Sequence, residues 1–241
     1  HHKTKRNNSM RVRNAKLWKK GAAGNQDQIN ADAIISFNAD CEPVYGFPII
    51  KKSKIPDIVD DDVVQISGNS ANWIGKVVNG FTDDYRLNAW WKNMHQYCTK
   101  MVESKAVFTP DYSIYSNMPM WMQNYQLGRS RFIGSYLQSY GIPVVPTITW
   151  TDMESHNRCT AGIDKGTTIA ISTIVGKDFN DKRIEKQFVS HIEKVIELIE
   201  PTTVYVYNRR FVQSLNALHN DMRYLHSHTQ KLNIKNASKK N

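Results

Sequence analysis

Strand-like and helix-like segments alternate along the chain after residue 81, and this alternation constrains the fold more than any other feature. The stretch "TDDYRLNAWWKNMHQYCTKMVES" begins with capping residues and carries apolar residues at helical spacing, which predicts a helix. The predicted elements that follow are a strand at 106–109, a helix at about 119–140, strands at 143–149 and about 167–174, an amphipathic helix that ends before Pro201, and a strand at 202–207. This order predicts βαβ units and an α/β fold with a mostly parallel sheet. The units are too few for a complete eight-fold barrel, so we expect either an open sheet or a partial barrel.

The predicted α/β domain spans residues 31–208. Over the whole chain, a hydrophobic content of 40% in 241 residues suits one moderate domain with extensions. Short strand-like runs at 47–50 and 63–66 stand in an otherwise irregular beginning. A basic arm, 1–30, precedes the domain, and a basic tail, 209–241, follows it, with helical stretches such as 211–225 expected in the tail.

The net charge of +10 is concentrated at the two ends. Residues 1–24 hold eight Lys and Arg and no acid, and residues 209–241 hold seven against one acid, whereas residues 25–208 have a net charge of −4. Basic ends attract polyanions and release counterions on binding nucleic acid, although such tails can also serve only solubility. We therefore predict a nucleic-acid partner, DNA or RNA, that contacts Lys5, Arg6, Arg11, Arg13, Lys16, Lys19, Lys20, Arg209 and Arg210.

The apolar runs argue against a membrane-spanning protein, and the cysteines argue against a disulfide-stabilised one. No apolar run approaches the roughly 18 residues that a membrane span needs, so no membrane partner is expected. The cysteines are three in number and far apart, which indicates reduced thiols rather than a disulfide framework.

Polar residues follow the predicted strands, and in parallel α/β folds ligands bind beyond the carboxyl ends of the strands. That geometry gathers the candidate residues on one edge of the sheet. The predicted catalytic residues there are Asp111 and Asp152, and the predicted substrate-binding residues are Ser113, Trp150, Ser172, Tyr207 and Asn208.

Arg129 is a third predicted catalytic residue. In the helix of about 119–140 it falls in the middle of an apolar stripe, whereas Arg131 falls on the opposite side. A guanidinium on a core-facing stripe is costly unless it is paired. Arg129 is therefore either a structural ion-pair partner or an anion-binding residue, and Asp111 is the expected partner in both cases.

The sequence contains no strong motif for another reaction or cofactor. The chain has no nucleotide-binding glycine motif and no metalloprotease or nucleophile-elbow motif. Asp111, Asp152 and Glu154 could form a divalent-metal site, but no third spacing cue supports it, so no metal is predicted and the cofactor stays unassigned. His156 could act as a base, although a lone loop histidine is more often a bystander.

Five segments stand in an order and spacing that resembles one known family: "FTDDYRLNAWW", "FTPDYSIYSNMP", "GRSRFIGSYLQSYGIPVVPTITW", "CTAGIDKGTTIAIST" and "TTVYVYN". It is an uncharacterised domain-of-unknown-function family of phages, plasmids and other mobile elements. The resemblance covers about residues 46–208 and implies a compact α/β domain with no assigned chemistry. The residues that match its motifs are Asp83, Asp84, Asp111, Ser113, Met118, Pro119, Arg129, Arg131, Trp150, Asp152 and Ser172. The chain departs from the pattern around 52–80, which looks expanded, and in its basic ends.

Two functions are compatible with these features. The first is a phage or mobile-element protein that holds nucleic acid through its basic ends and processes a nucleotide or nucleic acid in a strand-edge pocket. The second is a non-catalytic structural or protein-interaction component of a virion or an anti-defence complex. Under either function, we expect the protein in the cytoplasm of a bacterial host or in a virion. A bound metal or a strongly perturbed carboxylate in a real cleft would favour the first function, and a filled edge with Arg129 neutralised and no pocket would favour the second.

Overall fold

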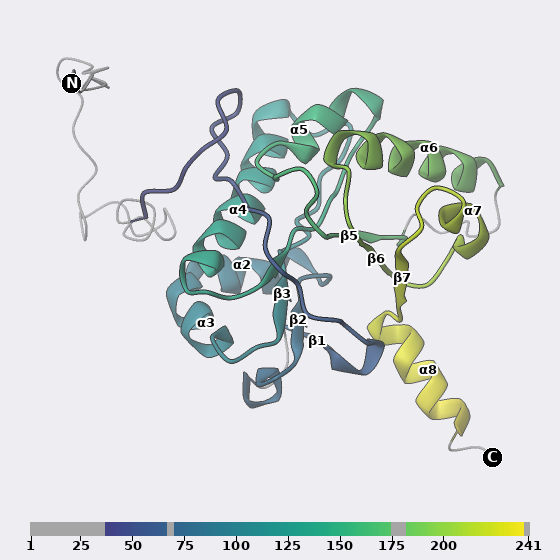
Figure 1. Cartoon of the computed structure of the whole chain (residues 1–241), viewed down its shortest axis with the longest axis horizontal. Coiled ribbons are helices and arrows are strands. Elements are labelled where there is room, and N and C mark those ends of the chain that lie inside the picture. Colours follow the sequence, from purple (N-terminus) through teal and green to yellow (C-terminus); the bar gives the residue numbers. More distant parts are fainter. Residues whose placement is uncertain (1–36, 67–69, 175–181, 239–241) are drawn as a thin grey trace. The chain divides into compact units, whose positions relative to one another are not determined.

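The computed structural model describes residues 37–66, 70–174 and 182–238. The predicted basic arm, 1–30, lies outside these residues. The larger compact unit of the chain begins at Ala39. Figure 1 shows its strands in the interior, with helices packed around them.

Within the described residues, seven parallel strands follow one another in sequence order. Their bounds are β1 Val63–Gln65, β2 Val77–Asn79, β3 Ala106–Phe108, β4 Val144–Val145, β5 Ile169–Ser172, β6 Val204–Tyr207 and β7 Met222–Leu225. The first four form one sheet in the order β1-β2-β3-β4, and the last three form another in the order β5-β6-β7. Every pairing between these strands is parallel. The predicted α/β class with a mostly parallel sheet is confirmed.

A parallel bridge between Thr147 and Ala170 joins the two sheets. The Ala170 N–H donates to Pro146 O at 2.9 Å, and the Ile148 N–H donates to Ala170 O at 2.9 Å. One buried apolar cluster takes side chains from all seven strands: Val63, Val77, Ala106, Phe108, Val145, Ala170, Tyr205, Tyr207 and Leu225. Because strands of a flat sheet could not all reach one cluster, the sheet curls around a shared interior, as in a partial barrel.

The β7 end of this curl is tied back to the segment before β1. The His226 N–H donates to Asp60 Oδ1 at 2.7 Å, and the Lys231 ammonium donates to the backbone oxygens of Asp60 and Val63. Arg223 forms an ion pair with Asp57. Side chains, rather than a strand ladder, therefore hold the two ends of the curl together.

The helices lie outside the strands. Their bounds are α2 Asp84–Lys92, α3 Met94–Met101, α4 Met120–Ser139, α5 His156–Thr160, α6 Lys182–Ile199, α7 Val212–Asn216 and α8 His228–Ser238, with short 3-10 turns η1 Asp60–Asp62, η2 Ser70–Trp73 and η3 Met153–Ser155. The predicted stripe of α6 packs as expected: Phe188, Ile192, Val195 and Ile199 bury against the outer side chains of β5 and β6. This burial is the main reason that a helix of this sequence stays on the sheet.

Two predicted elements differ from the prediction in length. The first predicted helix breaks at Asn93, whose side-chain amide donates to Ala89 O at 3.0 Å and competes with the helical backbone. The strand predicted at 143–149 is regular only at Val144–Val145, because Pro146 has no N–H to donate to a ladder. The helix predicted at about 119–140 spans Met120–Ser139, with Pro119 at its N-cap, close to the predicted bounds.

The chain beyond residue 208 also differs from the prediction. The sequence predicts helix over 211–225, but these residues contain only the short α7 and then strand β7, which pairs with β6. We propose that the α/β unit extends from residue 39 to residue 238 rather than ending at 208. Strand β2 lies in a segment that the sequence predicts to be irregular.

Candidate functional site

A cavity of about 1060 Å³ opens at the carboxyl ends of the strands. All seven strand ends contribute to its lining. The lining residues at or after the carboxyl ends of β1 to β7 include, in turn, Gln65, Phe81, Asp111, Thr149, Ser172, Tyr207 and Ser227, and the first two turns of α8 add His228, Thr229, Gln230 and Asn233. We call this space the mouth cavity. It occupies the position where parallel barrels bind their ligands.

Asp111 is the carboxylate most perturbed by this setting. It follows β3, lies half-buried in the lining, and accepts a hydrogen bond from the Thr149 hydroxyl. Burial raises the pKa of Asp111 from 3.8 to about 6, the Thr149 hydrogen bond opposes that shift, and the charge of Asp84 adds to it. Asp111 can therefore gain or lose a proton near neutral pH.

A close backbone approach fixes the position of Asp111. Its N–H donates to Gly80 O at 3.1 Å. A Cβ at Gly80 would lie 2.7 Å from Pro110 Cα and 2.7 Å from Thr109 O, so only glycine allows the exit of β2 to pack against the exit of β3.

Trp150 lines the cavity and is held by a stack of rings. Its ring centroid lies 5.6 Å from that of His191 and 5.4 Å from that of Phe188. His156 is buried, stacks on His191 at 5.0 Å, and donates from Nδ1 to Met153 O at 2.9 Å. His156 Nε2 lies 3.2 Å from His191 Nδ1, within hydrogen-bond distance, and burial together with the neighbouring His156 lowers the pKa of His191. These contacts orient His156 as a support for Trp150.

The end of β6 carries strained backbone. Asn208 and Phe211 have φ values of 67° and 52°, a left-handed conformation that is unusual for phenylalanine. Asn208 is buried and held by its N–H to Leu225 O and by the Thr173 hydroxyl on its carbonyl. Such strain persists only where the surroundings enforce it, and it concentrates at functional sites. This loop places Arg210 in the cavity lining.

The remaining predicted substrate-binding residues also line the cavity, and each has a structural contact. The Ser113 hydroxyl donates to Asp84 Oδ1 at 3.2 Å. The Ser172 hydroxyl accepts from the Ile174 N–H at 3.2 Å. The Tyr207 ring stacks on Phe81 at 4.6 Å, and its hydroxyl accepts from the His228 N–H at 3.1 Å.

Arg129 has different partners from the one predicted. It is 6% exposed and donates to Asn88 Oδ1 at 2.7 Å and to Gln126 Oε1. Its guanidinium lies 3.7 Å from the ring centroid of Tyr112 and 4.9 Å from that of Tyr125. The expected pairing with Asp111 is therefore wrong, because aromatic faces and amide oxygens surround this charge. Arg129 is not among the residues of the cavity lining.

Arg131 is fully buried, contrary to its expected position on the opposite side from the core. It donates to the carbonyl oxygens of Ala161, Thr147 and Cys159. Every residue of α4 from Arg129 to Leu137 is buried, so both arginines face protein.

Asp152 lies at the start of η3. Its Oδ1 accepts from the Ser155 N–H at 2.9 Å, and the two residues form a reciprocal capping box. Asp152 does not belong to the cavity lining as the described residues define it. Among those residues, no group of three or more His, Cys, Asp or Glu is arranged to hold a metal ion.

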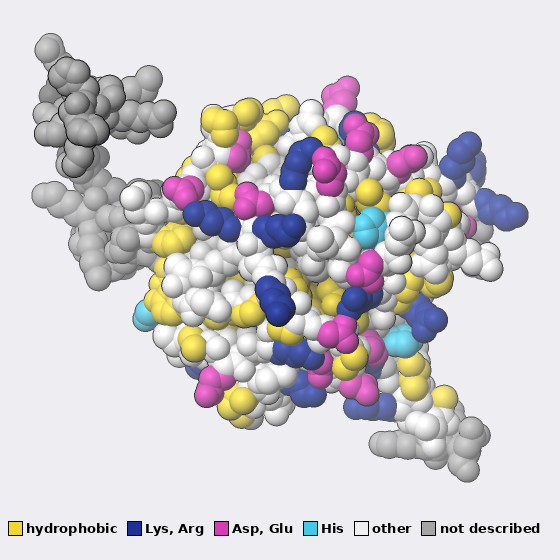
Figure 2. Space-filling model, in the orientation of Figure 1, with side chains coloured by type: hydrophobic (Ala, Val, Ile, Leu, Met, Phe, Trp, Pro, Cys, Tyr) yellow, Lys and Arg dark blue, Asp and Glu magenta, His cyan; other side chains and the backbone are white. Residues whose placement is uncertain are grey.

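The basic residues of the C-terminal segment divide into two groups. Arg209 is exposed, and Arg210 lines the cavity. Arg223 is paired with Asp57 and Asp221, and Lys231 lies 3.6 Å from Asp60. Figure 2 shows Lys and Arg interspersed with Asp and Glu over the face in view. The predicted contacts from Lys5 to Lys20 lie outside the described residues.

Sequence reasoning missed the contributions of β1, β2, β7 and α8. The carboxyl end of β1 could have been found, since the sequence predicts a strand at 63–66. Arg86 in α2 and His228 in α8 had no such signal, because they reach the lining from helices.

The family model described as a domain of unknown function, DUF4417, matches residues 41–224. The chain belongs to the DUF4417 family. This DUF4417 protein is 29% identical over 136 residues to the gene 1 protein of Mycobacterium phage L5, which covers 56% of this chain and 58% of the phage protein. It is 28% identical over 182 residues to the gene 1 protein of Mycobacterium phage D29, which covers 70% and 66%. It thus spans about three fifths to two thirds of the length of these curated relatives.

No solved structure matches this DUF4417 protein. The predicted resemblance to an uncharacterised phage family is confirmed, and the relatives are phage proteins of unknown function. Over the described residues, no helix is both long enough and apolar enough to span a bilayer.

Proposed function

We propose that the mouth cavity binds a nucleotide or the end of a nucleic-acid chain and processes it with Asp111 as the general acid or base. One observation carries this proposal: a carboxylate whose pKa is raised to about 6 lies in the lining of a cavity formed by all seven strand ends. Perturbed carboxylates in clefts are the usual acids and bases of enzymes.

The cavity lining offers the groups that a nucleotide needs. Trp150 presents an indole that can stack on a base, and the ring contacts behind it fix its orientation. Arg86 and Arg210 line the cavity and present guanidinium groups for phosphate oxygens, although Arg86 also lies 4.0 Å from Asp83 and donates to the Tyr85 hydroxyl. In this proposal Arg129 and Asp152 act as structural supports, because neither lines the cavity.

The basic ends would provide a second set of contacts to nucleic acid. The charges of the first 24 residues are unopposed by acids in that segment, and Arg210 lines the mouth cavity next to the exposed Arg209. Arg223 and Lys231 contribute less, since their partners are carboxylates of the same chain. The proposal places the protein in the cytoplasm of the bacterial host, where this nucleic acid would be met.

The test is a binding and turnover screen on the full chain with nucleoside mono- and triphosphates and short single strands. We expect Trp150→Leu to weaken binding of the active ligand about tenfold or more, as removal of one stacked base does. Asp111→Asn should leave binding within a few-fold and abolish turnover. Asp152→Asn is the matched control for removal of a carboxylate. The proposal fails if binding and turnover are the same in all variants.

Binding of nucleic acid by the basic arm, 1–30, is tested separately. Changing Lys16, Lys19 and Lys20 together to glutamine should make the salt dependence of single-strand binding shallower, by about 0.7 for each phosphate that the protein no longer neutralises. An unchanged salt slope would remove the arm from the proposal.

One surface supports the second candidate function, a protein-interaction component. Tyr85, Tyr115, Met120, Trp121 and Tyr125 are each more than half exposed, and they come from α2, the 110–119 turn and the start of α4. Large exposed aromatic side chains are typical of protein interfaces. If Trp121→Ser abolishes co-purification of a phage protein with this chain, and no nucleotide binds, this function replaces the first.

A further inference from the structure

A second, smaller cavity of about 420 Å³ lies between β1, η2 and α8. Its lining includes Asn72 and Trp73 of η2, Asn79 at the end of β2, and Lys231 and Lys235 of α8. We call it the side pocket. Nothing in the proposed chemistry of the mouth cavity uses it.

The side pocket is rich in hydrogen-bond donors, and no carboxylate is among the described residues that line it. Four basic residues do so: His226, His228, Lys231 and Lys235. Trp73 is 2% exposed, and its indole N–H has no hydrogen-bond partner among the described residues. Ammonium, imidazole and indole N–H groups are the donors that an oxyanion site uses.

Two of the basic residues are already engaged. Lys231 and His226 both contact Asp60, at 3.6 Å and 3.1 Å, so their charge is largely offset. The side chains of Lys235 and His228 form no ion pair or hydrogen bond with any residue that the structure describes. They are therefore the groups available to an incoming anion.

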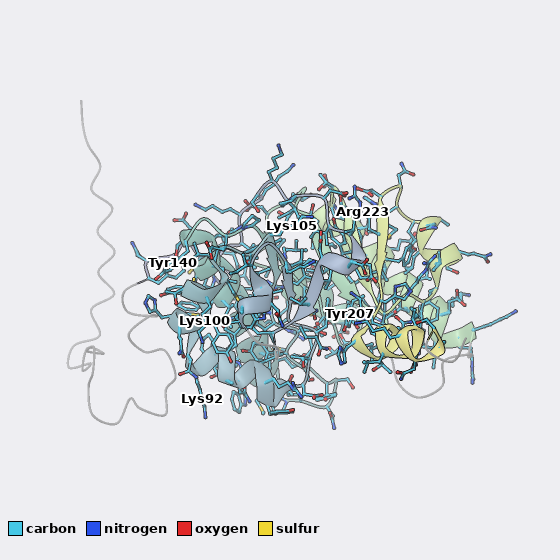
Figure 3. The ribbon with its side chains drawn as sticks, turned by 90° about the horizontal axis from the view of Figure 1, so that it is seen from below. Lys92, Lys100, Lys105, Tyr140, Tyr207 and Arg223 are labelled. Atoms are coloured by element: carbon cyan, nitrogen blue, oxygen red, sulfur yellow. The ribbon has the colours of Figure 1, made fainter. Side chains whose placement is uncertain are left out.

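The side pocket and the mouth cavity share three lining residues, Gln65, Tyr207 and His228. Figure 3 shows Tyr207 beside α8, and the Tyr207 hydroxyl accepts from the N–H of His228 at the start of that helix. One ligand can thus occupy both, with a nucleoside in the mouth cavity and the neighbouring phosphate in the side pocket.

We propose that the side pocket binds the phosphodiester next to the nucleotide held in the mouth cavity, so that the ligand is a single strand of nucleic acid rather than a free nucleotide. This inference rests on the proposed function of the mouth cavity. It makes Lys235 the residue by which the protein distinguishes a strand from a mononucleotide, because Lys235 lines the side pocket and does not line the mouth cavity.

The test compares thymidine monophosphate, inorganic phosphate and an oligothymidylate of about eight nucleotides, by fluorescence anisotropy and calorimetry on the full chain. Lys235→Gln should weaken oligonucleotide binding about fivefold and make its salt slope shallower by about 0.7, with a larger effect for Lys235→Glu. Binding of the monophosphate should not change. Lys100→Gln removes an exposed charge from α3, away from Tyr207 in Figure 3, and should change neither ligand.

The outcomes separate the two proposals. Oligonucleotide binding that is unchanged in Lys235→Glu, or equally weakened in Lys100→Gln, overturns the side-pocket inference and leaves the mouth cavity intact. Binding of inorganic phosphate alone, dependent on Lys235 and without binding of the oligonucleotide, also overturns it, because the site would then serve free phosphate. If strand binding requires Lys235 but is unchanged in Trp150→Leu, and turnover is unchanged in Asp111→Asn, the side pocket stands as a phosphate site and the proposed function of the mouth cavity fails.

Discussion

The junction of α4 with α5 and the mouth cavity both hold polar groups in poorly solvated surroundings, but they use them differently. At the junction, Arg131 is fully buried and donates to three backbone carbonyls. Burial lowers its pKa to about 10. In the mouth cavity, Asp111 accepts a hydrogen bond from Thr149 and belongs to the lining of an open space.

Polar groups at the junction therefore serve the fold, whereas polar groups in the mouth cavity are available to a ligand. Arg131 ties α4 to the exit of β4 and to α5, so its cost of burial is offset by contacts that hold the fold together. The charged form of Asp111 remains destabilised by burial, as its raised pKa shows. A group in this condition can exchange protons or bind a ligand. Residues of the first kind should govern stability, and residues of the second kind should govern binding.

The largest expected effect is at Arg131. Arg131→Met leaves three buried carbonyl oxygens without their donor, and we expect a decrease of about 3–5 kcal/mol in the free energy of unfolding. Urea denaturation measures it, with the exposed Arg209→Met as control. A decrease below about 1 kcal/mol would mean that water or other donors satisfy these carbonyls, and the contrast with the mouth cavity would disappear.

Asp111→Asn should act in the opposite direction. The folded protein binds the Asp111 proton more tightly than the unfolded chain, so its contribution to stability falls as pH rises from about 4 to about 6. Above that window the charged carboxylate costs about 2–3 kcal/mol, and asparagine removes this cost. We expect the variant to be more stable than the parent at about pH 8 and equal to it near pH 4. Urea denaturation at the two pH values measures the difference, and a variant destabilised under the alkaline condition would make Asp111 structural.

Arg129 should give an intermediate result. Arg129→Met removes contacts to aromatic faces and amide oxygens but breaks no ion pair to a described residue, so we expect a decrease of about 2 kcal/mol in the free energy of unfolding. Thermal melting with Lys92→Met as control measures it. A decrease as large as that of Arg131→Met would indicate a stronger anionic partner, and failure of ligand binding with normal melting would make Arg129 a binding residue.

The smallest effect belongs to Asp152. Asp152→Ala removes the cap of η3, and we expect a decrease of about 1 kcal/mol in the free energy of unfolding with ligand affinity unchanged. Chemical denaturation and the nucleotide titration together measure it. Reduced affinity at unchanged stability would place Asp152 within reach of the ligand and widen the candidate site.

The sequence was sufficient for most elements and for part of the candidate site. The period of apolar residues predicted α4, α6, β3, β5 and β6, because each packs apolar side chains into the interior. The carboxyl ends of these strands and of the strand predicted at 143–149 could then be assigned to one edge, which gathered Asp111, Trp150, Ser172 and Tyr207. Strands β2 and β7 were not predicted, because β2 offers only two valines before the polar Asn79, and β7 includes the charged Arg223 and is mostly only partly buried.

What the sequence determined by itself is the alternation of elements, since local patterns of apolar residues fix which segments are strands and which are helices. Only the tertiary structure decided that the sheet curls, that β7 and α8 close the mouth cavity, and which arginine meets which partner. Arg129 and Arg131 illustrate the reason: helical spacing gives the direction of a side chain from its own axis, whereas the groups it meets come from segments far away in the chain.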